Sequence, residues 1–253
     1  MWPHKPTQTH PPSPPPPPPL GPPPFWPKQK VIEKEVQVAL NTRQKLAVPL
    51  TEKEVLSKDS RRFRFALPSE DHKLGLPVGK HFFVSGRWNG EFVMRPYTPV
   101  TGDDVTGYVD LVYTPNDRFP QGGKMSQLLD SLEIGDTIDI KGPVGEIVYL
   151  EPGQFLIKNK PRNANKLAML AGGTGITPMY QVLKAILQNP DDDTECSLIY
   201  ANQTEKDILL RDELDAMAEA HPNQFNLWYT VDRPVEGWKY DKVGALSYLI
   251  RTH

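Results

Sequence analysis

The pattern of apolar and polar positions divides the chain into two parts with different periods. Between about residues 47 and 140, the pattern consists of short segments in which apolar and polar residues tend to alternate, as expected for strands with one buried face. These segments are 47–51, 61–67, 81–86, 91–97, 107–113 and 137–140. Many short strands separated by turn residues predict an antiparallel barrel or sandwich.

Beyond residue 160, short apolar runs alternate with segments of helical spacing. The run 167–170 predicts a buried strand, and the apolar residues that follow predict a helix at about 178–188. A strand, a helix and a strand are then predicted at 196–201, 211–220 and 226–231. Strands that alternate with helices indicate a parallel sheet. The segment 150–162 is polar and contains proline and glycine, so we expect the domain boundary there.

The first 30 residues differ from the rest of the chain in their proline content. They contain 14 of the 28 prolines, including the unbroken run from Pro14 to Pro19. Proline lacks the N–H group that helices and sheets require, so residues 1–30 are predicted to be polyproline II or disordered. A docking segment for a proline-recognition module and a simple tether are both compatible with this composition, which alone favours the tether. Residues 31–47 are predicted to be a lead-in to the first domain.

Composition excludes several classes of function. The formal net charge is −2 and no basic stripe is present, which argues against a nucleic-acid partner. No apolar run approaches the roughly 18 residues of a membrane span, and the N-terminus has no apolar signal core. Cys196 is the single cysteine, and the histidines are scattered without metal-ligand spacing. We therefore expect a cytoplasmic protein without a metal site.

Two glycine-rich turns precede predicted helices. Gly172-Gly173-Thr174-Gly175 stands between a strand and a helix, and Gly122-Gly123 precedes a helix that contains Leu128 and Leu129. Such a turn can bring backbone N–H groups and the positive end of a helix close to a phosphate, because no Cβ blocks the approach. Each turn taken alone is equally compatible with a tight turn before an ordinary packing helix.

Three motifs in one order carry a family resemblance. Arg95-Pro96-Tyr97-Thr98 resembles the Arg-x-Tyr-Thr/Ser flavin motif of the ferredoxin-reductase superfamily. The segment from Gly122 to Ser126 resembles its flavin-pyrophosphate motif, and the segment from Gly172 to Pro178 resembles its nicotinamide-domain motif. Within the superfamily, residues 48–240 resemble the NADH–cytochrome b5 reductases and the FAD–NADH domain of eukaryotic assimilatory nitrate reductases.

The resemblance implies a fold of class β plus α/β. An antiparallel six-stranded FAD-binding barrel is expected at 48–155, followed by a parallel α/β nicotinamide-binding domain at 163–253. The family continues after the position of Tyr240 with a Cys-Gly-Pro-Pro turn that this sequence lacks, so we expect the second domain to be incomplete. The strand near 110–116 is also shorter than in the family and lacks its flavin-contacting lysine.

The resemblance also implies a flavin site. Arg95 is expected to pair with the FAD pyrophosphate, Tyr97 to lie beside the isoalloxazine, and Thr98 to bond its reactive edge. The full predicted set of flavin-binding residues is Arg95, Pro96, Tyr97, Thr98, Val112, Phe119, Gly122, Gly123, Lys124, Met125 and Ser126.

A nicotinamide site is implied at the second glycine turn. The predicted residues are Gly172, Gly173, Thr174, Gly175, Thr177, Pro178 and Asp207. Thr98 and Thr177 are the predicted catalytic residues: Thr98 is expected at the reactive edge of the flavin, and Thr177 and Pro178 are expected to face the flavin ring. An Asp207 carboxylate bonded to the adenosine ribose would repel a 2′-phosphate and favour NADH, whereas a helix N-cap before Ile208 is equally compatible with the sequence.

The predicted activity is transfer of a hydride from NADH to FAD, followed by transfer of single electrons to a haem acceptor. The acceptor is expected to be cytochrome b5 or the b-type haem domain of nitrate reductase, the latter with a role in nitrate assimilation. One alternative is a catalytically impaired, truncated homologue that acts as a binding protein through its proline-rich arm. Another is a protein that binds FAD but handles NADH weakly.

Overall fold

The computed structural model describes residues 36–57, 60–113 and 123–240, all within one compact unit, Val36–His253. The proline-rich segment, Phe119, Gly122 and the C-terminal residues 241–253 lie outside the described residues. In the part of the chain that the structure describes, no helix is both long and apolar enough to cross a membrane.

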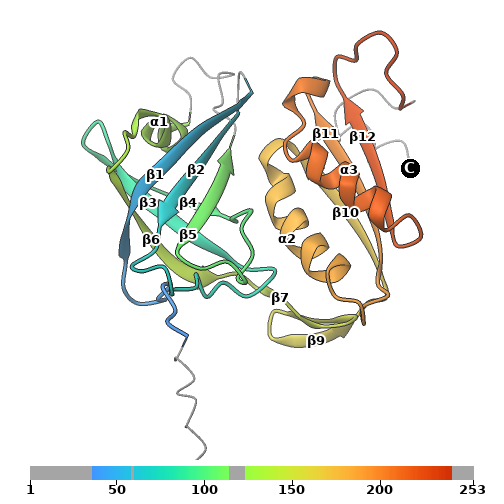
Figure 1. Ribbon diagram of the computed structural model, residues 1–253, viewed down its shortest axis with the longest axis horizontal. Coiled ribbons are helices and arrows are strands. Elements are labelled where there is room, and N and C mark those ends of the chain that lie inside the picture. The colour runs from blue at the N-terminus through green and yellow to red at the C-terminus, as the bar shows by residue number, and fades with distance from the viewer. Residues whose placement is uncertain (1–35, 58–59, 114–122, 241–253) are drawn as a thin grey trace, which may run out of the picture. The chain divides into compact units, whose positions relative to one another are not determined.

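The first half forms a six-stranded antiparallel sheet, which confirms the predicted class (Figure 1). Its strands are β1 (Leu46–Ser57), β2 (Ser60–Ala66), β3 (His81–Trp88), β4 (Glu91–Tyr97), β5 (Tyr108–Tyr113) and β6 (Thr137–Val144), in the order β4-β3-β6-β1-β2-β5. Just after β4, the backbone N–H of Val100 donates to the carbonyl of Asp110 in β5 at 3.0 Å. The segment that follows β4 therefore reaches the opposite edge strand of the sheet, so the sheet curls round in the manner of a barrel.

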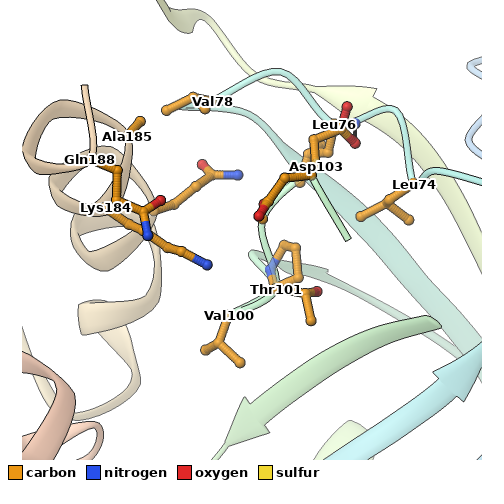
Figure 2. Close-up of a pocket in the computed structure, with 13 residues that line it drawn as sticks. Leu74, Leu76, Val78, Val100, Thr101, Asp103, Lys184, Ala185 and Gln188 are labelled. Carbon is orange, nitrogen blue, oxygen red and sulfur yellow. Dashed lines mark hydrogen bonds between the residues drawn. The ribbon is translucent and has the colours of Figure 1, made fainter. Parts of the chain in front are cut away.

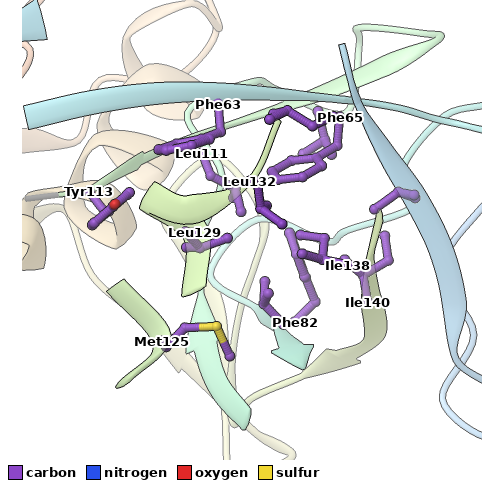
Figure 3. Close-up of a cluster of buried hydrophobic side chains, with 14 of the residues drawn as sticks. Phe63, Phe65, Phe82, Leu111, Tyr113, Met125, Leu129, Leu132, Ile138 and Ile140 are labelled. Carbon is purple, nitrogen blue, oxygen red and sulfur yellow. The ribbon is translucent and has the colours of Figure 1, made fainter. Parts of the chain in front are cut away.

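The barrel encloses an aromatic and aliphatic core (Figure 3). Phe63 and Phe65 from β2 and Phe82 from β3 have no solvent exposure, because the alternating pattern turns every second side chain inward. Helix α1 (Lys124–Ser131) adds Met125 and Leu129 to the same cluster. The first glycine-opened helix is thus fixed to the barrel by its apolar face.

The predicted boundary segment 150–162 is folded rather than irregular. It belongs to a small antiparallel sheet of β7 (Ile147–Glu151), β8 (Gln154–Ile157) and β9 (Lys160–Asn163). Lys158 and Asn159 turn the chain between β8 and β9 with φ angles of 52° and 59°. Two-residue turns with positive φ are usually indicated by Asn-Gly or Asp-Gly, and this one has neither, so the sequence pattern did not reveal the hairpin.

The second half is a parallel sheet, as predicted. Strands β10 (Lys166–Gly172), β11 (Glu195–Asn202) and β12 (Phe225–Val231) are neighbours in sequence order, connected by α2 (Ile176–Leu187) and α3 (Arg211–Ala220). Two short 3₁₀ turns, η1 (Gly173–Gly175) and η2 (Glu205–Asp207), follow β10 and β11. Helix α2 begins two residues before the predicted start, because its first turn accommodates Pro178.

Rows of side chains across this sheet build the second core. Ala171, Tyr200 and Tyr229 occupy one row on the three neighbouring strands, on the face that buries Leu183 of α2 and Leu214 of α3. Both connections run in the same direction along the sheet, so right-handed crossovers place both helices on this face. The carboxyl ends of β10 and β11 consequently lie side by side, where η1 and η2 begin.

Candidate functional site

The N-terminus of α1 is open to an anion. Its N-cap residue, Gly123, has extended backbone angles (φ −73°, ψ 126°), and no side chain caps the helix. The N–H groups of a first turn have no partner inside the helix, and the helix dipole places partial positive charge there. Gly123 and Lys124 are both exposed, so a phosphate group can reach these N–H groups.

One basic side chain lies at this helix start and another on the neighbouring strand β4. The Lys124 ammonium pairs with the Glu91 carboxylate at the beginning of β4. Arg95, further along β4, is paired across the sheet with Val84, a fully buried residue of β3. Arg95 therefore lies on the core-facing side of its strand and is nevertheless exposed, and its Nη1 donates to the Met94 carbonyl at 2.8 Å. The exposed guanidinium and the uncapped helix fit a dinucleotide pyrophosphate.

The remaining predicted flavin residues have different environments. Tyr97 packs against the barrel core; burial raises the pKa of its hydroxyl to about 12, although the Arg95 charge acts in the opposite direction. Thr98 is half-buried directly after β4, and Pro96 is exposed. The Ser126 carbonyl accepts a hydrogen bond from the Tyr113 hydroxyl at 2.9 Å.

Two predicted flavin-binding side chains are buried in apolar clusters. Met125 is 3% exposed in the barrel core, so only its backbone is available to a ligand at the start of α1. Val112 is also 3% exposed and belongs to the core of the second half. The burial of these two side chains is a packing role that the motif did not predict.

The N-terminus of α2 is also accessible to an anion, but its first turn carries no basic side chain. Gly173 has a φ of +52°, and a Cβ added at Gly173 or Gly175 would meet no atom within 4 Å. No side chain caps η1 or α2, and neither has a basic residue in its first turn. A turn of this shape offers backbone N–H groups and room for close approach, without a charged side chain. It fits the phosphates of a second dinucleotide.

Thr177 serves the turn itself. It is 6% exposed, and its Oγ1 donates to the Thr174 carbonyl at 3.3 Å. Pro178 beside it is half-buried. The predicted catalytic contact of Thr177 with the flavin stays a prediction, and the hydroxyl already has a partner inside the protein.

Asp207 closes a capping box. Its Oδ2 accepts hydrogen bonds from the Thr204 backbone N–H at 2.9 Å and from the Thr204 hydroxyl at 2.7 Å. The N-cap of the following helix, α3, is Leu210 with a φ of 56°. The suggestion that Asp207 is a helix N-cap before Ile208 is therefore wrong in position, because the carboxylate stabilises η2. The predicted hydrogen bond between Asp207 and the adenosine ribose does not depend on this capping role and stays a prediction.

The structure groups the predicted residues at two places. Those of β4 and α1 gather beside the barrel core, and those of η1, α2 and η2 gather at the carboxyl ends of β10 and β11. Parallel α/β sheets bind ligands at that edge. Sequence reasoning missed Tyr200, whose hydroxyl contacts both the Gly173 carbonyl and the Leu209 N–H. Nothing in the local pattern distinguishes this tyrosine from a packing aromatic.

A separate hollow of about 310 Å³ lies between barrel loops and the later turns of α2 (Figure 2). Leu74, Val100 and Lys184 are among its lining residues. Asp103 also lines it, but this carboxylate already accepts the backbone N–H groups of Gly75 and Leu76 at 2.6 and 3.0 Å. The hollow contains none of the predicted site residues, so it is distinct from both helix starts.

Comparisons with protein families agree with the two-part architecture. Residues 47–149 match the family model described as "Oxidoreductase FAD-binding domain". Residues 169–253 match the model described as "Oxidoreductase NAD-binding domain". The first match covers the six-stranded sheet with α1, and the second covers η1 with the parallel sheet, so each helix start falls within the domain expected to bind that dinucleotide.

Individual relatives show which type of FAD- and NAD-binding oxidoreductase this chain resembles. The chain is 53% identical to NADH-cytochrome b5 reductase 2 of Xenopus tropicalis, covering 85% of this chain and 74% of that protein. It is 52% identical to nitrate reductase [NADH] of Spinacia oleracea, covering 85% of this chain but only 24% of the nitrate reductase. The crystal structure of the cytochrome b5 reductase domain of Ulva prolifera nitrate reductase superposes with a TM-score of 0.78 at 48% identity, covering 81% of this chain and 80% of that one. The chain therefore belongs to the FAD- and NAD-binding ferredoxin-reductase family and is an NADH-dependent flavin oxidoreductase of the cytochrome b5 reductase type.

Proposed function

We propose that this chain passes the electrons of NADH, through bound FAD, one at a time to a haem protein of the cytochrome b5 type. The observation that supports this acceptor is the 53% identity, over 85% of the chain, to a protein named NADH-cytochrome b5 reductase 2. The similar identity to nitrate reductase favours the same chemistry, with a haem domain of that enzyme as the alternative acceptor.

The residues of the first site would hold the cofactor. Arg95 and the open start of α1 would neutralise the pyrophosphate charge, and Tyr97 offers an apolar body with a polar tip for the ring system. When bound, FAD supplies a ring that accepts a hydride and releases electrons singly. The site needs no protein acid or base for hydride transfer, because that step depends on the position of the two rings.

The residues of the second site would bind the substrate. The N–H groups of η1 and α2 would bond the phosphates of NADH, and the open space beside Gly173 and Gly175 allows the phosphates to come close. Asp207 would face the ribose, and its fixed negative charge would disfavour the extra phosphate of NADPH. This arrangement accounts for a preference for NADH.

The acceptor is tested with FAD-loaded protein and NADH. Three acceptors are compared: ferricyanide, isolated cytochrome b5, and the haem domain of a nitrate reductase. Ferricyanide reports flavin reduction alone, since it needs no specific docking surface. We expect rapid reduction of ferricyanide and of at least one haem protein. Reduction of ferricyanide with neither haem protein reduced would disprove the acceptor while leaving the NADH–flavin reaction intact.

The preference for NADH is tested with Asp207→Asn. Asparagine keeps an oxygen for the Thr204 N–H, so the capping box retains an acceptor while the charge is lost. We expect the ratio of kcat/KM for NADH over NADPH to fall roughly fivefold, the effect of about 1 kcal/mol of charge repulsion. Asp212→Asn, an exposed carboxylate in the first turn of α3, is the control and should leave the ratio unchanged.

A further inference from the structure

A buried tyrosine bridges the two segments that begin at the carboxyl ends of β10 and β11. Tyr200 in β11 has no solvent exposure. Its hydroxyl donates to the Gly173 carbonyl in η1 at 3.0 Å. The same oxygen accepts the backbone N–H of Leu209, two residues after Asp207, at 3.3 Å. One side-chain oxygen therefore connects the glycine turn with the segment that contains the predicted ribose ligand.

The hydroxyl has the protonation state that this bridge needs. Burial raises the pKa of Tyr200, and the hydrogen bond from the Leu209 N–H only partly opposes this effect. Tyr200 is consequently a neutral donor at physiological pH. The Gly173 carbonyl also accepts the Ile176 N–H, so both of its lone pairs are used and the carbonyl is held toward the protein interior.

The direction of this carbonyl determines the direction of the next N–H group. In a planar trans peptide, the carbonyl of Gly173 and the N–H of Thr174 point to opposite sides. Because the carbonyl points inward to Tyr200, the Thr174 N–H points away from the core, and Thr174 is an exposed residue. Rotation of this peptide changes ψ of Gly173 and φ of Thr174, and Gly173, which has a φ of +52° and no Cβ, restrains its own ψ less than another residue would. The bonds from the Tyr200 hydroxyl and the Ile176 N–H to the Gly173 carbonyl therefore supply restraint that the glycine itself does not.

We propose that Tyr200 is a positioning residue for the dinucleotide substrate: its hydroxyl holds the Gly173–Thr174 peptide so that the Thr174 N–H faces the pyrophosphate. This inference rests on the proposed binding of NADH at η1. Tyr200 itself touches no substrate. Its hydrogen bond restrains this peptide before binding, so the ligand does not have to order the turn.

The same strand register provides a matched control. Tyr229 in β12 is the register partner of Tyr200, is equally buried, and donates from its hydroxyl to Asp215 Oδ1 of α3 at 2.9 Å. Changing either tyrosine to phenylalanine removes one buried hydroxyl and one donated hydrogen bond on the same face of the same sheet. Only the Tyr200 bond reaches the glycine turn.

The experiment compares Tyr200→Phe with Tyr229→Phe in the FAD-loaded full chain. We expect Tyr200→Phe to raise the KM for NADH and the dissociation constant of NAD⁺, measured by calorimetry, by roughly two- to tenfold, the effect of one neutral hydrogen bond. The kcat should stay within about twofold of wild type, because the rings are not touched. Tyr229→Phe should lower the melting temperature similarly and leave both binding values unchanged.

Fragments of NAD⁺ test whether the effect of Tyr200→Phe depends on the pyrophosphate. ADP-ribose, which contains the pyrophosphate, should lose the same factor as NAD⁺ in Tyr200→Phe, whereas inhibition by adenosine should be unaffected. Equal weakening of NAD⁺ by both tyrosine variants, or a fall in kcat with an unchanged KM, would overturn the inference. A wild-type chain that binds neither NAD⁺ nor ADP-ribose would instead overturn the proposed function, so the two failures are distinguishable.

Discussion

The two glycine-opened helix starts are built alike but would hold their ligands differently. Neither α1 nor α2 has a side-chain cap, so the N–H groups of each start are not satisfied by a side chain. At α2 the Ile176 N–H is bonded within η1 and Pro178 has no N–H, so fewer groups are available there. The start of α1 has the Lys124 ammonium on it and the exposed Arg95 guanidinium on the neighbouring β4. The start of α2 has no basic residue in its first turn and instead has open space beside Gly173 and Gly175. One site would bind phosphates through charged side chains together with N–H groups, and the other would bind them through backbone N–H groups alone.

The difference between the two helix starts matches the different residence times that FAD and NADH need. A resident cofactor has to stay bound through every turnover, and charge-assisted hydrogen bonds are roughly twice as strong as neutral ones. A substrate has to leave after each reaction, so a site made of neutral N–H groups is sufficient. A tyrosine supports each start: Tyr113 donates to the Ser126 carbonyl within α1, and Tyr200 donates to the Gly173 carbonyl in η1. Only Tyr200 fixes a peptide of the turn itself.

The largest expected effect is that of Arg95→Ala on FAD. Removing a hydrogen-bonded charge costs about 1.5–3 kcal/mol, so FAD affinity should fall roughly 10- to 100-fold. Fluorescence titration of the apoprotein with FAD measures it. Arg87→Ala is the control, because Arg87 is also exposed, lies on the adjacent strand β3 and bonds the Gly90 carbonyl. Comparable losses in both variants would show that the Arg95 effect is not local.

The next effect is that of Gly173→Ala on NADH. The new methyl group would occupy the open space and strain a residue with a φ of +52°, so we expect the KM for NADH to rise about tenfold, or about 1.4 kcal/mol, with FAD affinity unchanged. Gly237→Ala is the matched control, since Gly237 has a φ of +83° and equally open surroundings. If Gly237→Ala raised the KM as much, general strain and not the phosphate site would be responsible.

Lys124 should contribute less to FAD binding than Arg95. Its ammonium is exposed and already paired with Glu91, and exposed pairs contribute little. Lys124→Ala should weaken FAD by about threefold, whereas Glu91→Gln should free the ammonium and tighten FAD slightly. The same fluorescence titration measures both variants. Weaker FAD binding in Glu91→Gln would contradict the idea that this carboxylate competes with the phosphate.

The smallest expected effect on catalysis is that of Thr177→Val. The hydroxyl bonds the Thr174 carbonyl and is buried, so its loss should cost about 1 kcal/mol of stability. Flavin reduction by NADH, followed by stopped flow, should remain within about threefold of wild type. A tenfold slower reduction at saturating NADH would instead support the catalytic role that the motif suggested for Thr177.

The sequence predicted the secondary structure that follows from which residues are buried. It did not predict the hydrogen bond between segments that are far apart in the chain. Alternating and helical periods report which faces are buried, so the six-stranded sheet, the parallel sheet and the three α-helices of the described residues could be predicted. The β8–β9 hairpin was missed because Lys158 and Asn159 are not the usual turn pair. The capping role of Asp207 could have been predicted locally, because Thr204 and Asp207 have the three-residue spacing of a capping box. The bridge made by Tyr200 depends on which segments meet at the carboxyl ends of the strands, and no local pattern contains that information.

Rapid anaerobic mixing of the FAD-loaded protein with NADH is the most direct test of whether NADH reduces the bound flavin. We predict loss of the oxidised-flavin absorbance at a rate that saturates with NADH concentration. Gly173→Ala should raise the half-saturating concentration and leave the limiting rate nearly unchanged, because η1 would bind the substrate and not the flavin. A wild-type protein that retains FAD but keeps its flavin oxidised in excess NADH would contradict the account.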